Sequence, residues 1–236
     1  MAKPLMPRLA KWHIWLGWLV GFPIAMWMAS GLFMASRPID QVRGDHLRLQ
    51  RPEAADFLPA GNPAPIDFPV DNYRPVVELR TAMQRGRAVT TVTYADGRVE
   101  RYDAGDGTPI EALGEADARE VVRSQIAGGN DVSSATLFGA DEPPFDFRRA
   151  MAVWQVTLED GTHVYVGRDT GEIEAVRTRW WRMFDFMWGL HIMDLQTREK
   201  TSHPILILFA TLGLIGALIG CILMFRKRKA RVTAHG

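Results

Sequence analysis

Long uncharged segments lie near both ends of the chain. Between Ile205 and Phe225, twenty-one residues carry no charge, and a helix of that length rises about 30 Å, the thickness of a bilayer's hydrocarbon core. A second uncharged run extends from Trp12 to Ser36, with His13 as its only titratable group. This run is longer than the roughly 7–15 residues of a signal-peptide hydrophobic region, which favours an uncleaved span over a cleaved leader. The pattern predicts two transmembrane helices.

Between the spans the pattern changes to one that is typical of a folded, water-facing domain. We predict a Pro-rich extended connector over residues 37–75, with a short strand near its end, followed by an α+β domain over residues 76–178. Within that domain Val76–Gln84 is predicted as a short helix. An amphipathic segment rich in Trp and Phe, residues 179–196, precedes residues 197–236, which hold the second span and a basic tail. The predicted fold class is therefore membrane α-helical plus α+β.

An internal repeat organises the middle domain. Val92-Thr-Tyr-Ala-Asp96-Gly97 resembles Val156-Thr-Leu-Glu-Asp160-Gly161, at an offset of 64 residues. Each copy alternates apolar and polar residues on both sides of an Asp-Gly pair, which is the strongest short-range signal for a β-hairpin. A helical pattern closed by two glycines lies between the copies, at Glu115–Ala127. We expect two repeats, about 76–113 and 115–176, made of antiparallel sheets with short helices on one face.

The distribution of charge predicts how the two spans are oriented across the membrane. All 27 acidic residues lie between Asp40 and Glu199, whereas both ends of the chain are basic. The cluster Arg226–Lys229 follows the second span directly, and the positive-inside rule places such a cluster in the cytoplasm. We therefore expect a multi-pass protein with both termini cytoplasmic and the acidic domain outside. The acidic domain also argues against nucleic-acid binding, which needs a basic surface.

The order of these segments is similar to a known family. The helix at Glu115–Ala127, the strand beginning at Trp154 and the Asp160-Gly161 turn resemble a PepSY domain, and the copy at Val92–Leu113 resembles a second, more degenerate one. Trp12-His13-Ile14-Trp15-Leu16-Gly17 resembles the first span of PepSY-associated transmembrane proteins, and Gly189-Leu190-His191 resembles the stretch before their last helix. The resemblance implies a bacterial inner membrane and a periplasmic central domain. Larger members include ferric-siderophore reductases that carry haem between helices.

Three histidines are the candidate site residues. The resemblance implies that His13, His191 and His203 are haem-iron ligand positions, with haem b as the cofactor. His13 and His191 lie at opposite ends of the membrane layer, about 30 Å apart, so one iron cannot join them. Either His191 and His203 share a haem within one chain, or like histidines face each other across a homodimer. The alternative is structural: His13 reaches the cytoplasmic interface while the other two form hydrogen bonds at the outer surface.

Small residues provide the predicted partner surface. Gly17, Gly21, Ala25 and Ala29 continue the line of His13 along the first span, and Ala210, Gly213, Ala217 and Gly220 form a comparable face on the second. Such faces allow helices to pack closely, either within the chain, in a homodimer or with other membrane subunits, and the lipid bilayer covers the rest.

Two functions follow from these features. The first is a redox role linked to iron or ferric-siderophore reduction, with electron transfer through haem. The second is a non-catalytic, membrane-anchored module that binds a peptide or peptidase by strand addition. The intramembrane histidines favour the first, and the absence of a recognisable catalytic motif in the outer domain favours the second.

Overall fold

The structure is a computed structural model that describes residues 5–49, 57–66 and 74–233, with side chains described as far as Phe225. It consists of two compact units. We call Met1–Pro38 together with Arg182–Gly236 the span unit, and Ile39–Trp181 the central unit. The chain passes from the central unit back into the span unit within one helix, α4 (Arg179–His191).

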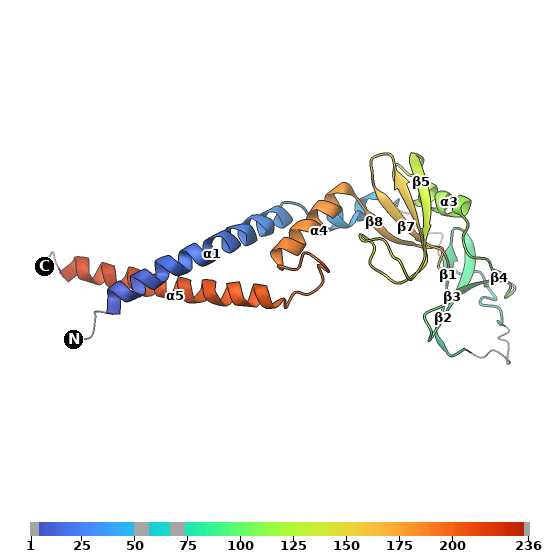
Figure 1. The fold of residues 1–236 in the computed structure, drawn as a ribbon. Helices are drawn as coiled ribbons and strands as arrows, with labels where there is room; N and C mark the ends of the chain where they lie inside the picture. Colours follow the sequence, from blue (N-terminus) through green and yellow to red (C-terminus); the bar gives the residue numbers. More distant parts are fainter. Residues whose placement is uncertain (1–4, 50–56, 67–73, 234–236) are drawn as a thin grey trace. The chain divides into compact units, whose positions relative to one another are not determined.

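The span unit contains the two predicted long helices, α1 (Leu5–Ala35) and α5 (Pro204–Thr233). Both are long and apolar enough to cross a membrane, and they run antiparallel and side by side (Figure 1). Their large apolar side chains are mostly exposed, as with Trp18 and Phe22, which is the arrangement expected of helices surrounded by lipid. Pro23 lies inside α1, a position that membrane helices tolerate.

The contact between α1 and α5 uses only one of the two predicted small-residue faces. On α5, Gly213 faces Ile24 and Gly216 faces Leu16 of α1. On α1, by contrast, a Cβ added at Gly17 or Gly21 would have no other residue within 4 Å, and Ala25 and Ala29 are exposed. We call Gly17, Gly21, Ala25 and Ala29 the open face of α1.

A compact loop joins α4 to α5. Its carboxylate, Asp194, accepts hydrogen bonds from the backbone N–H groups of Thr197, Glu199 and Lys200 and from the Thr197 hydroxyl. The predicted amphipathic helix ends at His191, so Leu195 is not part of it. Asp185 of α4 is buried and forms an ion pair with Arg198 of the loop.

The first sheet of the central unit is a four-stranded antiparallel meander in the order β1-β2-β3-β4. Its strands are β1 (Val76–Gln84), β2 (Arg87–Tyr94), β3 (Val99–Asp103) and β4 (Pro109–Ile110). The prediction of a helix at Val76–Gln84 is wrong. Val76, Leu79 and Met83 have helical spacing, but the whole segment forms a ladder with β2, and this long-range pairing outweighs a short local pattern.

The second sheet repeats the first, in the order β5-β6-β7-β8. Its strands are β5 (Val132–Phe138), β6 (Val153–Leu158), β7 (His163–Gly167) and β8 (Ile173–Arg177). Both predicted Asp-Gly hairpins are formed, and their registers correspond: Thr93 pairs with Val99, as Thr157 pairs with His163.

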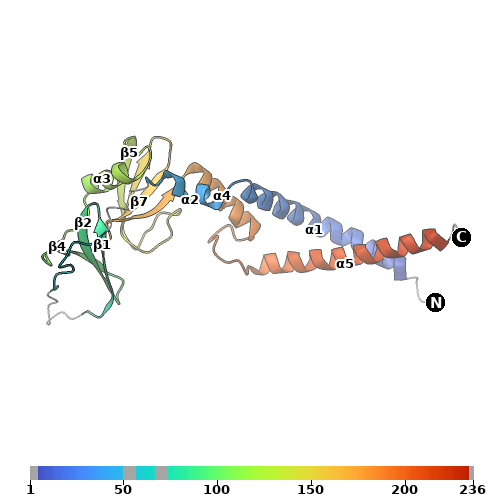
Figure 2. The same ribbon diagram turned by 180° about the vertical axis from the view of Figure 1, so that it is seen from behind.

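One helix, α3 (Glu115–Gln125), covers the second sheet and lies beside β5 in both views (Figure 1 and Figure 2). Ala118, Val121 and Val122 of α3 pack with Val156 and Val164 of the sheet, all without solvent exposure. The α3 residues are spaced so that they lie on one face of the helix, and the sheet residues alternate so that they lie on one face of the sheet. The two apolar faces pack together in one layer. This layer is the main core of the central unit.

The predicted connector, residues 37–75, is not extended at its start. The short helix α2 (Ile39–Arg43) and the 3-10 helix η1 (Asp45–Leu47) follow the first span, and Val42 is buried. Arg48 then forms an isolated bridge with Ile126. A short strand is predicted near the end of the connector, most of which, residues 67–73, lies outside the described residues.

Candidate functional site in the span unit

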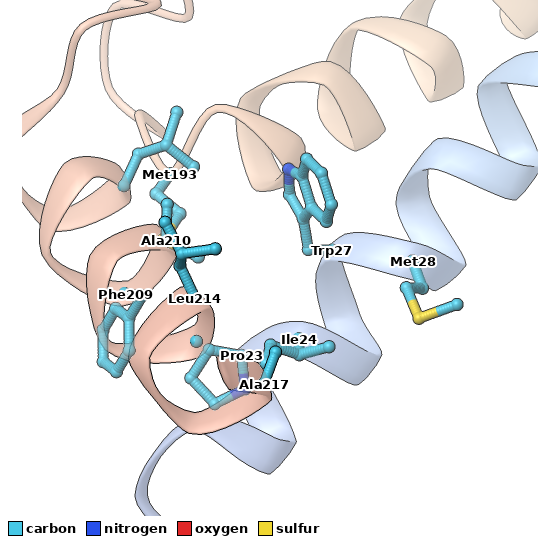
Figure 3. A pocket seen from close by; sticks show the side chains of 11 residues that line it. Pro23, Ile24, Trp27, Met28, Met193, Phe209, Ala210, Leu214 and Ala217 are labelled. Carbon is cyan, nitrogen blue, oxygen red and sulfur yellow. The ribbon is translucent and has the colours of Figure 1, made fainter. Parts of the chain in front are cut away.

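Two adjoining cavities lie between α1 and α5. The first has a volume of about 350 Å³ and an almost wholly apolar lining, to which α1 contributes Pro23 and Ile24 and α5 contributes Phe209 and Leu214 (Figure 3). The second, of about 430 Å³, shares Pro23 and Phe209 with the first. It also has polar lining groups, which include His203. Of the three candidate histidines, His203 lines the second cavity, whereas His13 and His191 line neither.

His13 is held by the opposite span. Its Nδ1 lies 3.0 Å from the carbonyl oxygen of Gly216 in α5, and its ring packs so closely on Gly220 that an added Cβ would lie 2.9 Å from Cε1. The ring of His13 thus contacts α5, and whether its position lies at the cytoplasmic interface stays a prediction. Because Gly220 has no side chain, the His13 ring can approach the α5 backbone closely enough to form a hydrogen bond with it.

His191 is held in the same way at the end of α4. Its Nδ1 lies 3.2 Å from the carbonyl oxygen of Trp27 and 3.1 Å from the hydroxyl of Ser30, both in α1. Its ring stacks on Trp27, with 4.9 Å between centroids and 14° between planes. Gly31 provides the space, because a Cβ there would lie 3.2 Å from Cε1.

These contacts assign the ring protons. A carbonyl oxygen can only accept, so the hydrogen bonds to Gly216 and Trp27 require that Nδ1 of each ring carries the proton. In a neutral imidazole Nε2 then carries the lone pair. Among the described residues, neither Nε2 atom has a hydrogen-bond partner. Histidines that bind metals are commonly oriented by such an Nδ1–H bond to a carbonyl.

His203 differs from the other two. It directly precedes α5, and its Nδ1 is buried without a hydrogen-bond partner among the described residues. It lines the larger cavity, whereas His191 does not. The contacts of the two side chains thus give no support to a shared haem between His191 and His203 in one chain.

His13 and His191 are also kept apart. Ser30, which contacts His191, follows His13 by 17 residues along α1, a rise of about 26 Å. The span unit therefore holds two histidine positions at two levels, each formed by an imidazole and a glycine of the facing helix.

A separate polar cluster of Asp146, His163 and Tyr165 lies in the central unit. Asp146 accepts hydrogen bonds from His163, at 3.0 Å, and from the hydroxyl of Tyr165, a fully buried residue. Burial alone would raise the pKa of Asp146, but the hydrogen bonds from His163 and Tyr165 outweigh it and hold that pKa below its usual value. Burial and the bond to Asp146 raise the pKa of Tyr165. The cluster fastens the loop before β6 to the sheet, and the spacing of its members gave no sign of it.

Fold and site together define a membrane protein with two apolar spans and a central domain of repeated β-meanders. The family model of the PepSY-associated TM region matches residues 10–235. The chain belongs to this family and is a membrane PepSY-domain protein. Comparisons with curated proteins and with solved structures find no match.

Proposed function

We propose that this chain is an electron-transfer protein of the bacterial inner membrane that takes part in the reduction of iron or ferric siderophores. In this proposal it binds haem b through His13 and His191. The observation that supports the proposal is the shared orientation of the two rings: each donates its Nδ1–H to the facing helix and keeps Nε2 for a ligand. Haem, when bound, supplies one-electron redox chemistry.

His13 and His191 are too far apart to bind the same haem iron, so the proposal needs two haem positions at different depths of the membrane. His13 and His191 lie about 26 Å apart along α1, so each needs a second ligand from elsewhere. A second copy would provide it in a homodimer, and the open face of α1 leaves one surface of that span uncovered by its own chain. Small residues at this spacing allow close approach of helices. The proposed unit is a homodimer with four spans, in which like histidines face each other at each level.

An absorbance spectrum tests the proposal. Full-length protein produced with haem available and purified in mild detergent should show a Soret band, with about one haem per chain. His13→Ala and His191→Ala should each remove about half of the haem, and the double variant should remove nearly all of it. His46→Ala, at an exposed histidine outside both spans, is the matched control and should retain full haem content.

The result that would overturn the proposal is a colourless protein that also fails to take up added haemin. Haem that persists unchanged in the double variant would reject the assigned ligands. Haem loss in His203→Ala with none in His191→Ala would move the outer site to the larger cavity.

The second candidate function is peptide binding in the outer domain, and one observation favours it. Within the described part of the chain β1 pairs only with β2, and its side chains Val77 and Leu79 are 68% and 56% exposed. An edge strand of nine residues with apolar side chains can accept a peptide as an added strand. Replacing Val77 with Pro, which removes one backbone N–H of β1, should weaken such binding and leave the haem spectrum unchanged.

A further inference from the structure

A cavity in the central unit is bordered by three arginines. It has a volume of about 540 Å³ and lies between the first sheet and α3. Arg85 and Arg87 reach it from the β1–β2 hairpin and Arg101 from β3. Arg87 is neutralised by Asp103, at 2.7 Å. Among the described residues, neither Arg85 nor Arg101 forms an ion pair.

Arg101 is an unusual residue to find in this position, because it is only 3% exposed. One terminal nitrogen, Nη2, donates to the carbonyl oxygen of Glu111 at 2.8 Å. Its Nε is buried and has no acceptor among the described residues. Gly171 makes room for the other terminal nitrogen, since a Cβ there would overlap Nη1. Burying a cation with an unmet N–H is costly, unless a ligand completes it.

Arg85 adds a second positive charge to the same place. It occupies the turn between β1 and β2 with a φ of 52°, a left-handed conformation that is uncommon for residues other than glycine and asparagine. Burial, followed by repulsion from Arg85, lowers the pKa of Arg101. Attraction from Asp169 and Asp117 offsets this repulsion only in part. Since neither guanidinium group forms a salt bridge in the described part of the chain, the pair forms an attractive field for an anion.

The remaining lining limits the kind of anion. Asp117 and Glu120 of α3 border the cavity, and each already has a partner: Asp117 accepts from the Gly114 N–H, and Glu120 pairs with Arg123. Their charges disfavour a dianion such as phosphate. Gln84, also in the lining, has a buried Oε1 with no donor among the described residues. The cavity thus offers unpaired donors and one unpaired acceptor.

We propose that this cavity binds a small monocarboxylate that also carries a hydrogen-bond donor. Arg101 and Arg85 bind the carboxylate, and Gln84 Oε1 accepts from the adjacent N–H or O–H. The carboxyl end of a peptide and a free 2-hydroxy acid share this chemistry. The site lies wholly in the central unit and does not depend on haem.

Titration calorimetry on the full-length protein in detergent tests the site with defined probes. N-acetyl-dialanine should bind, whereas its C-terminal amide and inorganic phosphate should each bind on the order of tenfold more weakly or worse, because a charged hydrogen bond is lost or repulsion is gained. Lactate is the second carboxylate probe. Tighter binding of the acetylated dipeptide identifies a peptide end, and tighter binding of lactate identifies a hydroxy acid.

Variants separate the site from general folding. Arg101→Lys keeps the charge but loses the two-pronged geometry, and should weaken N-acetyl-dialanine binding about tenfold or more. Arg85→Gln changes an exposed turn residue, should fold normally, and should also weaken binding. Arg98→Gln, in the β2–β3 turn away from the cavity, should not change it. Equal affinity for acid and amide, no binding of either carboxylate up to about 10 mM, or normal binding by Arg85→Gln would overturn the proposal.

Discussion

The buried hydroxyl of Tyr165 provides a test of the polar cluster in the central unit. Tyr165→Phe removes one hydrogen bond to Asp146 while keeping the ring, which stacks on Phe147 with 4.8 Å between centroids. A hydrogen bond to a charged group contributes about 1.5–3 kcal/mol. Since about 1 kcal/mol changes the melting temperature by roughly 2–4 °C in a domain of this size, we expect a decrease of about 3–12 °C.

The assay is thermal unfolding of the full-length protein in detergent, followed by tryptophan fluorescence. Trp154 is a suitable reporter because its Nε1 donates to the Leu113 carbonyl within the same unit. Tyr102→Phe is the matched control. Its hydroxyl also bonds to a carboxylate, that of Glu100, but the pair is partly exposed and should contribute less than about 1 kcal/mol.

The dependence on pH makes the test sharper. The pKa of Asp146 is lowered in the folded protein, so its ionised form stabilises the fold at pH values above its ordinary pKa, near 4. That contribution disappears as the pH falls through the lowered pKa. The difference between Tyr165→Phe and the unmodified protein should therefore be constant from about pH 8 to 5 and shrink in stronger acid. An unchanged melting temperature, or a difference that persists in strong acid, would refute the reasoning.

Three further predictions concern the span unit and the topology. Gly220→Ala should displace the His13 ring and weaken its Nδ1–H signal in ¹⁵N NMR of histidine-labelled protein, whereas Gly17→Ala should leave that signal unchanged. Asp185→Ala removes the buried carboxylate that forms an ion pair with half-buried Arg198 and should cost about 1.5–3 kcal/mol of stability, measured by denaturant unfolding; a cost below about 1 kcal/mol would mean that the pair is solvated. Protease added to spheroplasts should cleave the central unit and spare tags at both termini, and cleavage of either tag would reverse the proposed orientation.

The parts of the fold that the sequence predicted correctly are those with strong local signals. A run without charge as long as Ile205–Phe225 has few alternatives to a span, and α5 begins at Pro204, a residue favoured at the first helical position. Asp96-Gly97 and Asp160-Gly161 fix their hairpins because the turn needs a residue at positive φ. Val76–Gln84 was ambiguous because a short apolar pattern fits both periods, and only its pairing with β2 decides.

The candidate site was predictable in its residue types but not in its contacts. The position of His13 and His191 on apolar stretches pointed to them. Their partners, Gly216 and Trp27, are distant in sequence, and nothing local indicates which backbone carbonyl a ring will reach. The same limit applies to Arg101, whose burial depends on a turn of the other repeat. The sequence shows that residue 101 is an arginine, but only the tertiary fold shows that its side chain is buried.

The match between each histidine and a glycine on the facing helix has an evolutionary consequence. Gly220 leaves room for His13, and Gly31 leaves room for His191, so within each pair the larger residue is tolerated only while its counterpart lacks a side chain. Selection on one position should therefore relax when the other changes. Among homologous sequences, histidine and glycine should therefore be lost together within each pair.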